Sequence, residues 1–133
     1  METIVILDTD VIIDFFSGIE PIASTAANLI KQDRLALTSV SVFELYAGIT
    51  GKKRLKQIDD LISAIPVLPL KKEDAKIASQ LYTDLEKGGK LIGNQDILIA
   101  GICINHDTPL LTRNIKLFSI IPRLKIYEVG IHA

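Results

Sequence analysis

Acidic residues follow the first apolar run of the sequence, where a strand would end. Residues 4–7 (Ile-Val-Ile-Leu) precede Asp8 and Asp10, and Asp14 comes a few residues later. A carboxylate at the end of a buried strand is costly unless a positive charge or a hydrogen-bond donor compensates it. Since the first 30 residues contain neither Lys nor Arg, these acids either face water or share a cation.

Other oxygen-bearing side chains occupy comparable positions later in the chain. Glu44 lies near the start of a helical segment, Asp96 in the first turn of an apolar one, and Asn114 just after an apolar run. In an open parallel sheet, ligands bind beyond the carboxyl ends of the strands, so these residues and Asp8 would meet at one edge. Converging carboxylates repel one another at low dielectric, and a hard divalent cation relieves the repulsion. The pattern therefore predicts a site for Mg²⁺, or for Mn²⁺, which accepts the same ligands.

Most of these residues also have a purely structural interpretation, in which they stabilise helix ends. The candidates are Thr9 or Asp10 as the cap of a first helix near Val11, Glu44 in a capping box with Ser41, Asp96 as a partner of its helix dipole, and Asn114 as a further cap. Taken one by one, these interpretations are the simpler ones. Only the combination of several such positions at one edge favours a functional site.

Apolar runs alternate with helical segments along the chain. Runs rich in Val, Ile and Leu predict strands at 3–7, 35–38, 66–70, 109–112 and 125–129. The spacing of apolar residues predicts helices at 21–32, 53–65 and 72–87. Residues 96–104 are apolar on every side, which predicts a buried helix with Asn94 as its N-cap. This alternation is typical of an α/β fold with a parallel sheet and helices on both faces, and the length predicts a single domain over residues 1–133.

Composition limits the other function classes. The net charge is −1, so no general positive field favours nucleic acid, although residues 52–56 (Lys-Lys-Arg-Leu-Lys) form a local basic run. That run has two interpretations, a solvated helix start and an RNA contact. The single Cys103 cannot form an internal disulfide, and no apolar run approaches the length of a membrane span, which favours the cytoplasm. Apolar residues make up 48% of the chain, which is consistent with a surface covered by a partner or a second copy, and equally with a larger buried core.

Other catalytic chemistries fit the sequence poorly. The two histidines, His106 and His132, do not have zinc-ligand spacing, and the sequence contains no Gly-x-Ser-x-Gly motif. Residues 48–52 (Gly-Ile-Thr-Gly-Lys) are too short for a phosphate-binding loop and are followed by Lys53 instead of Ser or Thr.

Four segments in order resemble the PIN-domain family, specifically the VapC-type toxin ribonucleases of type II toxin–antitoxin pairs. The segments are 4–14 (IVILDTDVIID), 38–48 (TSVSVFELYAG), 92–100 (IGNQDILIA) and 111–118 (LTRNIKLF). The first three resemble the family's motifs around its acids, and the fourth resembles its closing motif. The resemblance covers nearly the whole chain.

The resemblance implies a three-layer α/β/α PIN-like fold, with a central, mostly parallel sheet of four to five strands. It also implies an endoribonuclease that depends on Mg²⁺ or Mn²⁺ and hydrolyses RNA phosphodiester bonds. Asp8 and Asp96 would be the main metal ligands, and Glu44 would complete the acidic cluster directly or through water. The expected supporting and substrate-binding residues are Thr9, Thr112 and Arg113.

The family pattern also implies a homodimer, inhibited by a small antitoxin whose tail enters the acidic site. Asn114 stands where many PIN nucleases have a fourth catalytic aspartate. A neutral amide weakens the case for a second metal ion without removing the first. The identity of the RNA, its cleavage sequence and the number of metal ions stay open.

Three alternatives compete with the nuclease. A PIN-like module that binds RNA or a partner without efficient cleavage would be consistent with Asn114. Haloacid-dehalogenase-type phosphatases also begin with paired acids after a strand, but their motif requires Thr or Val at the position of Ile12. Response-regulator receivers require an acceptor Asp after the third strand, where this chain has Lys71. Both enzyme alternatives rank behind the nuclease.

Overall fold

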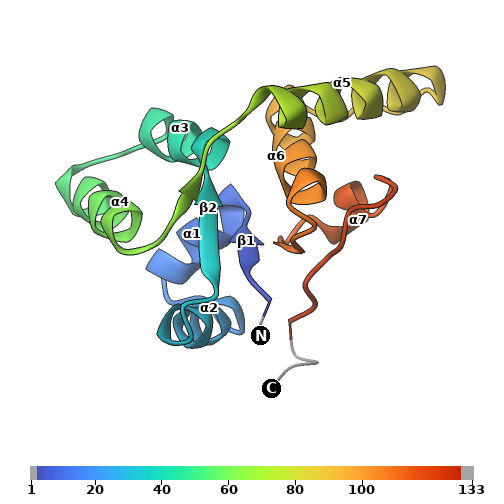
Figure 1. The fold of residues 1–133 in the computed structure, drawn as a ribbon. Helices are drawn as coiled ribbons and strands as arrows, with labels where there is room; N and C mark the ends of the chain where they lie inside the picture. Colours follow the sequence, from blue (N-terminus) through green and yellow to red (C-terminus); the bar gives the residue numbers. More distant parts are fainter. Residues whose placement is uncertain (1–2, 130–133) are drawn as a thin grey trace.

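A short parallel sheet forms the centre of the fold (Figure 1). The computed structural model describes residues 3–129 of the chain. The strands of this part are β1 (Val5–Leu7), β2 (Leu35–Thr38), β3 (Val67–Leu68) and β4 (Leu110–Leu111). They lie in the order β3-β2-β1-β4, and every neighbouring pair is parallel. The direction of strand succession changes beside β1, and open α/β sheets bind ligands at such a position.

Helices cover both faces of the sheet. The described helices are α1 (Thr9–Phe16), α2 (Ile22–Lys31), α3 (Ser39–Ala47), α4 (Lys52–Ala64), α5 (Lys72–Lys87), α6 (Asn94–Asn105) and α7 (Ile115–Phe118). Figure 1 shows α1, α2 and α4 on one side of the sheet, α5, α6 and α7 on the other, and α3 at the carboxyl end of β2. Among residues 3–129, no helix is long and apolar enough to cross a membrane.

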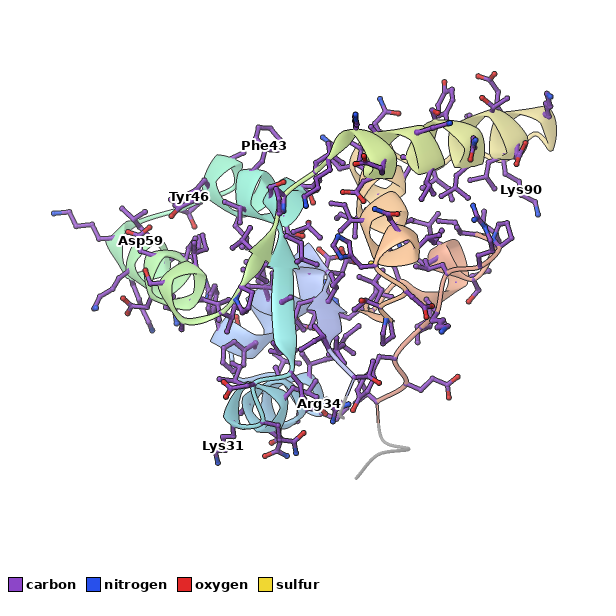
Figure 2. The ribbon with its side chains drawn as sticks, in the orientation of Figure 1. Lys31, Arg34, Phe43, Tyr46, Asp59 and Lys90 are labelled. Carbon is purple, nitrogen blue, oxygen red and sulfur yellow. The ribbon has the colours of Figure 1, made fainter. Side chains whose placement is uncertain are left out.

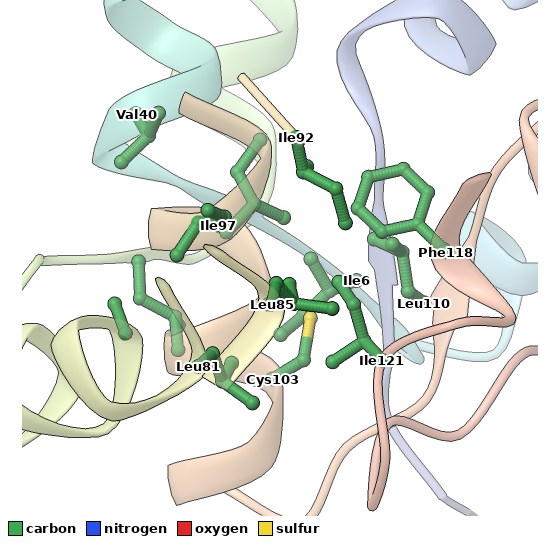
Figure 3. Packing of buried hydrophobic residues seen from close by; sticks show 14 of the residues in the cluster. Ile6, Val40, Leu81, Leu85, Ile92, Ile97, Cys103, Leu110, Phe118 and Ile121 are labelled. Carbon is green, nitrogen blue, oxygen red and sulfur yellow. The ribbon is translucent and has the colours of Figure 1, made fainter. Parts of the chain in front are cut away.

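The pleat of β1 divides the core into two clusters. Ile6 packs with α5, α6 and α7, whereas Val5 and Leu7 pack with α1, α2 and α4. Figure 3 shows the first cluster, in which Ile6 lies near Leu85 of α5 and Cys103 of α6. Cys103 is a buried core residue, as its apolar neighbours predict. Because both faces of the sheet are covered, the predicted three-layer α/β/α fold is confirmed, with four strands.

The predicted elements agree with most of this structure. The bounds of α5 are confirmed, and those of α2 and α4 agree to within one residue at each end. All four strands were predicted, although only β2 has its full predicted length. The strand predicted at 125–129 was wrong: only Ile126 pairs with the sheet, through a single parallel bridge to Leu110. The partner strand β4 is too short to support a longer ladder.

Two helices begin earlier than predicted. The first residue of α3 is Ser39, and Thr38 is its N-cap, so the predicted capping box at Glu44 was wrong. The first residue of α6 is Asn94, and Gly93 is its N-cap, so the prediction of Asn94 as the cap was also wrong. In α3 the cap is the last residue of β2 itself, so no loop separates the strand from the helix.

Candidate functional site

The predicted acids gather at the carboxyl-end edge of the sheet. Asp8 follows β1 directly, Glu44 lies in α3, and Asp96 lies in the first turn of α6. Burial is the main cause that raises the pKa of Asp96 to about 6. Nearby negative charges raise it further, namely those of Asp8, Glu44 and Asp10. The structure therefore brings acids from three separate segments within electrostatic reach of one another.

Asp8 is both a helix cap and a buried carboxylate. Its side chain is 5% exposed, and Oδ1 accepts a 2.9 Å hydrogen bond from the Thr9 backbone N–H. Asp8 is therefore the N-cap of α1, and the prediction that Thr9 or Asp10 caps this helix was wrong. Its Oδ2 accepts a 2.8 Å hydrogen bond from the Thr112 hydroxyl. Burial raises the pKa of Asp8 more than these two hydrogen bonds lower it, and nearby acids add to the rise.

Hydroxyl groups hold Glu44 in the same site. The Thr9 hydroxyl lies 2.8 Å from Glu44 Oε1 and 3.1 Å from the Ser41 hydroxyl. Ser41 is fully buried, and its backbone N–H donates to the Thr38 hydroxyl over 3.1 Å. Thr9 thus contacts the acid directly, and its supporting role stays a prediction. Ser41 was predicted only as a cap, and its place beside Thr9 depends on a contact across 32 positions that local sequence patterns do not encode.

The loop between β4 and α7 is fixed to the site by Thr112. The Thr112 hydroxyl donates to Asp8 and accepts a 3.0 Å hydrogen bond from the Asn114 backbone N–H. Asn114 occupies the N-cap position of α7, but its side chain makes no capping hydrogen bond. Asn114 therefore contributes to the site through its backbone. No direct contact of its side chain with the acids is found among the described residues.

Arg113 supplies the positive charge that the first 30 residues lack. Its guanidinium lies 3.2 Å from Asp14 and 3.7 Å from Asp10. Asp14 was predicted to lie on a helix face, whereas the structure buries it to 3% exposure beneath Arg113. Its partner stands 99 positions away, so spacing along α1 gave no signal for the contact. The opening acids therefore have two different environments, because Arg113 pairs with Asp10 and Asp14, whereas Asp8 lies among other acids.

The donor set suits a hard cation by its chemistry, although it does not form a closed ligand cage. Among residues 3–129, no three His, Cys, Asp or Glu side chains are arranged to hold a metal ion together. Mg²⁺ needs only one or two protein carboxylates, because it keeps several of its waters. Asp8 and Asp96 offer two such carboxylates, whose pKa values are raised by burial and, to a smaller extent, by repulsion from neighbouring acids. A divalent cation would relieve that repulsion.

Two of the basic side chains at the start of α4, Arg54 and Lys56, are engaged within the protein. The Arg54 guanidinium lies 5.6 Å from the centre of the Phe16 ring and donates to the Ser17 hydroxyl over 3.1 Å. Lys56 pairs with Asp60 one turn further along the helix, at 3.1 Å. These contacts favour the interpretation of the run as a helix start that packs on α1.

A family model confirms the class of protein that this fold and site define. The model for the PIN domain matches residues 5–124. The chain therefore belongs to the PIN-domain family, and the resemblance predicted from four short motifs is confirmed.

Curated relatives carry VapC names. Ribonuclease VapC2 of Rickettsia felis is 33% identical over 100 residues, which cover 72% of this chain and 75% of the relative. Ribonuclease VapC3 of Methanocaldococcus jannaschii is 34% identical over 97 residues, which cover 73% of this chain and 95% of the relative. The VapC-type resemblance is thus shared by a bacterial and an archaeal protein.

Solved structures agree in fold over nearly the whole chain. VapBC2 from Rickettsia felis, bound to a DNA fragment from its promoter, matches with a TM-score of 0.84 and 27% identity, covering 94% of this chain and 98% of that one. VapBC-1 from nontypeable Haemophilus influenzae matches with a TM-score of 0.80 and 26% identity, covering 95% of this chain and 98% of that one. Both neighbours are named as VapBC proteins.

Proposed function

We propose that this chain is a metal-dependent endoribonuclease and the toxin component of a toxin–antitoxin pair. The observation that carries the proposal is the coupling of Asp8 and Asp96 at the carboxyl-end edge of the sheet, where the pKa of Asp96 rises to about 6. Such perturbed acids are characteristic of functional sites. The ribonuclease names of the relatives support the same activity. RNA hydrolysis by such a toxin would take place in the cytoplasm.

Asp8 and Asp96 would hold Mg²⁺ or Mn²⁺, with Glu44 completing the site directly or through water. When bound, such a cation polarises a phosphate oxygen and favours deprotonation of water. Glu44 orients the attacking water and accepts its proton, while the Thr9 hydroxyl holds the Glu44 carboxylate in place. Thr112 keeps Asp8 in a fixed rotamer. Asn114 is neutral, so the donor set favours one metal ion over two.

The products follow from the nucleophile. Water attacks phosphorus, the bond from phosphorus to the 3′ oxygen breaks, and the leaving oxygen takes up a proton. The cleaved RNA therefore carries a 5′-phosphate and a 3′-hydroxyl. A mechanism in which the 2′-hydroxyl attacks would instead leave a cyclic phosphate.

Cleavage of a folded RNA pool by purified protein tests the proposal. The reaction is run with Mg²⁺, with Mn²⁺ and with EDTA, for the wild type, Asp8→Asn and the control Asp60→Asn. Asp60 is an exposed acid whose described partner is Lys56, so its loss should not affect catalysis. We expect metal-dependent cuts with 5′-phosphates for the wild type and Asp60→Asn, and none for Asp8→Asn that is folded by circular dichroism.

The competing function is a PIN-like module that binds RNA or a partner with weak or no cleavage. The Asn114 side chain and the lack of a closed ligand cage within residues 3–129 favour it. Folded wild-type protein that neither cuts any RNA in the pool nor binds Mg²⁺ or Mn²⁺ by calorimetry would establish this alternative.

Two protein partners belong to the proposal. The cognate antitoxin is one, because the structural neighbours are named as VapBC proteins.

A second copy of the chain is the other partner. Phe43 of α3 is 61% exposed, and Leu70 is exposed beside it, at a shallow groove of about 360 Å³. Figure 2 shows Phe43 on the outer side of α3. We expect Phe43→Ser to turn a dimer into a monomer in sedimentation experiments, whereas Tyr82→Ser on α5 should leave the dimer intact.

A further inference from the structure

A groove of about 600 Å³ lies directly beside the candidate site. Its walls come from the turn between α1 and α2, the loop between β4 and α7, and the segment 126–129. Most of the lining surface is apolar, with contributions from Ile22 and Ile115. Thr112 lines the groove and also donates to Asp8, so the groove and the acidic site adjoin at this residue.

Arg113 stands at the boundary between the groove and the acids. Its two terminal nitrogens face carboxylates, NH1 towards Asp14 at 3.2 Å and NH2 towards Asp10 at 3.7 Å. The side chain is still 53% exposed. Because these contacts engage its edge, the exposed guanidinium can still offer a planar face for stacking. The Asp14 side chain is 4% exposed, so it acts as a fixed support beneath Arg113.

We infer that this groove is the subsite for one unstacked nucleobase of the RNA, next to the cleaved bond, and that the base stacks on Arg113. Single-stranded RNA is recognised through splayed bases that stack on aromatic rings or on arginine planes. The volume of the groove is within the range of small-ligand pockets. Asp14 is then a positioning residue, which acts on the substrate only through Arg113. The inference rests on the proposed nuclease function and names the part of the substrate that the site reads.

Charge explains why a base, and not the phosphate backbone, occupies the groove. Glu20 and Glu128 line the groove together with the apolar residues. These acids would repel a phosphate, whereas a neutral base with amino groups can enter and donate to them. The backbone would stay on the side of the acidic site, where the proposed cation provides positive charge.

Filling the groove tests the inference without touching the acids. Ser119 is exposed and lines the groove, so Ser119→Phe would occupy the space of the base. Ser79→Phe is the matched control, since Ser79 is also exposed and lines a separate groove beside α5. We expect Ser119→Phe to raise KM about 10-fold with little change in kcat, which is the order of one lost stacking contact. It should also weaken the base preference at one position beside the cleavage site, read by sequencing the 5′-phosphate ends. Ser79→Phe should match the wild type.

A second pair of variants tests the positioning role of Asp14. Arg113→Gln and Asp14→Asn should each raise KM and relax the same base preference, and the double variant should be no worse than Arg113→Gln alone. A merely structural Asp14 would instead lower stability and leave the base preference unchanged.

The outcomes separate this inference from the proposed function. A wild type that cuts no RNA defeats the nuclease and the subsite together. A wild type that cuts, with KM and base preference unchanged in folded Ser119→Phe and Arg113→Gln, overturns the subsite alone. If those variants cut normally but resist inhibition by the cognate antitoxin, the groove binds protein and the RNA inference is wrong.

Discussion

Asp8 and Asp74 are two buried aspartates with similar hydrogen bonds and opposite surroundings. Asp74 is 0% exposed and accepts from the Lys71 backbone N–H at 2.9 Å and from the Asn105 amide at 2.8 Å. Asp8 likewise accepts from one backbone N–H and one side chain. Asp74, however, connects α5 to α6, whereas Asp8 lies among other carboxylates at an open edge. Hydrogen-bond satisfaction alone therefore does not distinguish a structural acid from a functional one.

The surroundings of the two residues decide their roles. Around Asp74 the packing is close, because Gly101 of α6 approaches the backbone of α5 directly. Around Asp8 the neighbours are charges of the same sign, and they raise its pKa along with burial. If only the stability of the fold mattered, neutral residues in place of these neighbouring acids would be more favourable. The cation that we propose between Asp8 and Asp96 would account for their presence.

The largest expected effect comes from exchanging the two aspartates for asparagine. Asp8→Asn should lower RNA cleavage by about 10³-fold or more, the order of losing a central electrostatic group. Its stability should be nearly unchanged, because removing a buried charge beside other acids offsets the loss of an acceptor. Asp74→Asn should keep the cleavage rate per folded molecule and lower the free energy of unfolding by about 1–3 kcal/mol, because Asn cannot satisfy both donors equally. Single-turnover cleavage and urea unfolding measure the two quantities. If both variants lose activity and stability together, the comparison fails.

Gly101→Ala sharpens the structural half of the comparison. A Cβ at this position would lie 2.6 Å from the Asp74 carbonyl oxygen and 3.1 Å from Ala78 Cβ. Since a backbone oxygen cannot move aside cheaply, we expect a loss of about 1–3 kcal/mol in urea unfolding, with the activity of the folded fraction retained. Gly88→Ala is the control, because its Cβ would meet the Leu85 carbonyl oxygen at an ordinary 3.6 Å. A Gly101→Ala protein as stable as Gly88→Ala would show that the two helices can separate.

Thr112→Val tests the functional half. The substitution keeps the shape of the side chain but removes the donor to Asp8, so we expect cleavage to fall by about 10-fold, the order of one hydrogen bond to a charged group. The Thr112 hydrogen bond lowers the pKa of Asp8, so its loss raises that pKa further. The acid limb of the pH–rate profile should therefore move to higher pH. Thr83→Val, which removes a hydroxyl on the exposed side of α5, should leave the profile where it is.

Patterns within short stretches of the sequence predicted individual helices and the protein family. The apolar spacing of residues 72–87 reproduced α5, and the order of four motifs led to the PIN-domain family. Helix starts were less accurate, because Asp8, Thr9 and Asp10 are all competent caps and only the end of β1 selects Asp8. The segment 125–129 has the composition of a strand, but its pairing depends on the length of β4.

Long-range partners were beyond any pattern in a single sequence. The pairing of Asp14 with Arg113 and the contact of Thr9 with Ser41 join residues from different elements. Three acids could be assigned to one edge only because parallel strands share a direction. Which hydroxyl or guanidinium meets each acid is decided by the packing of α1 against α3 and against the loop after β4.

The smallest expected effect is a dependence of stability on pH through Asp96. The pKa of Asp96 is about 6 in the folded chain, against about 4 for an unperturbed aspartate. Between these values the folded state binds more protons than the unfolded state, so the free energy of unfolding falls as the pH rises through this window. The side chain is partly exposed, and solvent screening keeps the effect modest.

Urea unfolding in EDTA measures this dependence as the difference between the wild type and Asp96→Asn. The variant should gain stability relative to the wild type as the pH rises from about 4 to about 6, because it no longer places a charge in a partly buried position beside Asp8 and Glu44. Added Mg²⁺ should then stabilise the wild type at neutral pH and have little effect on Asp96→Asn. A difference that stays constant with pH would mean that neither burial nor the neighbouring acids raise the pKa of Asp96. In that case Asp8 would be as structural as Asp74, and the case for a cation between Asp8 and Asp96 would lose its physical basis.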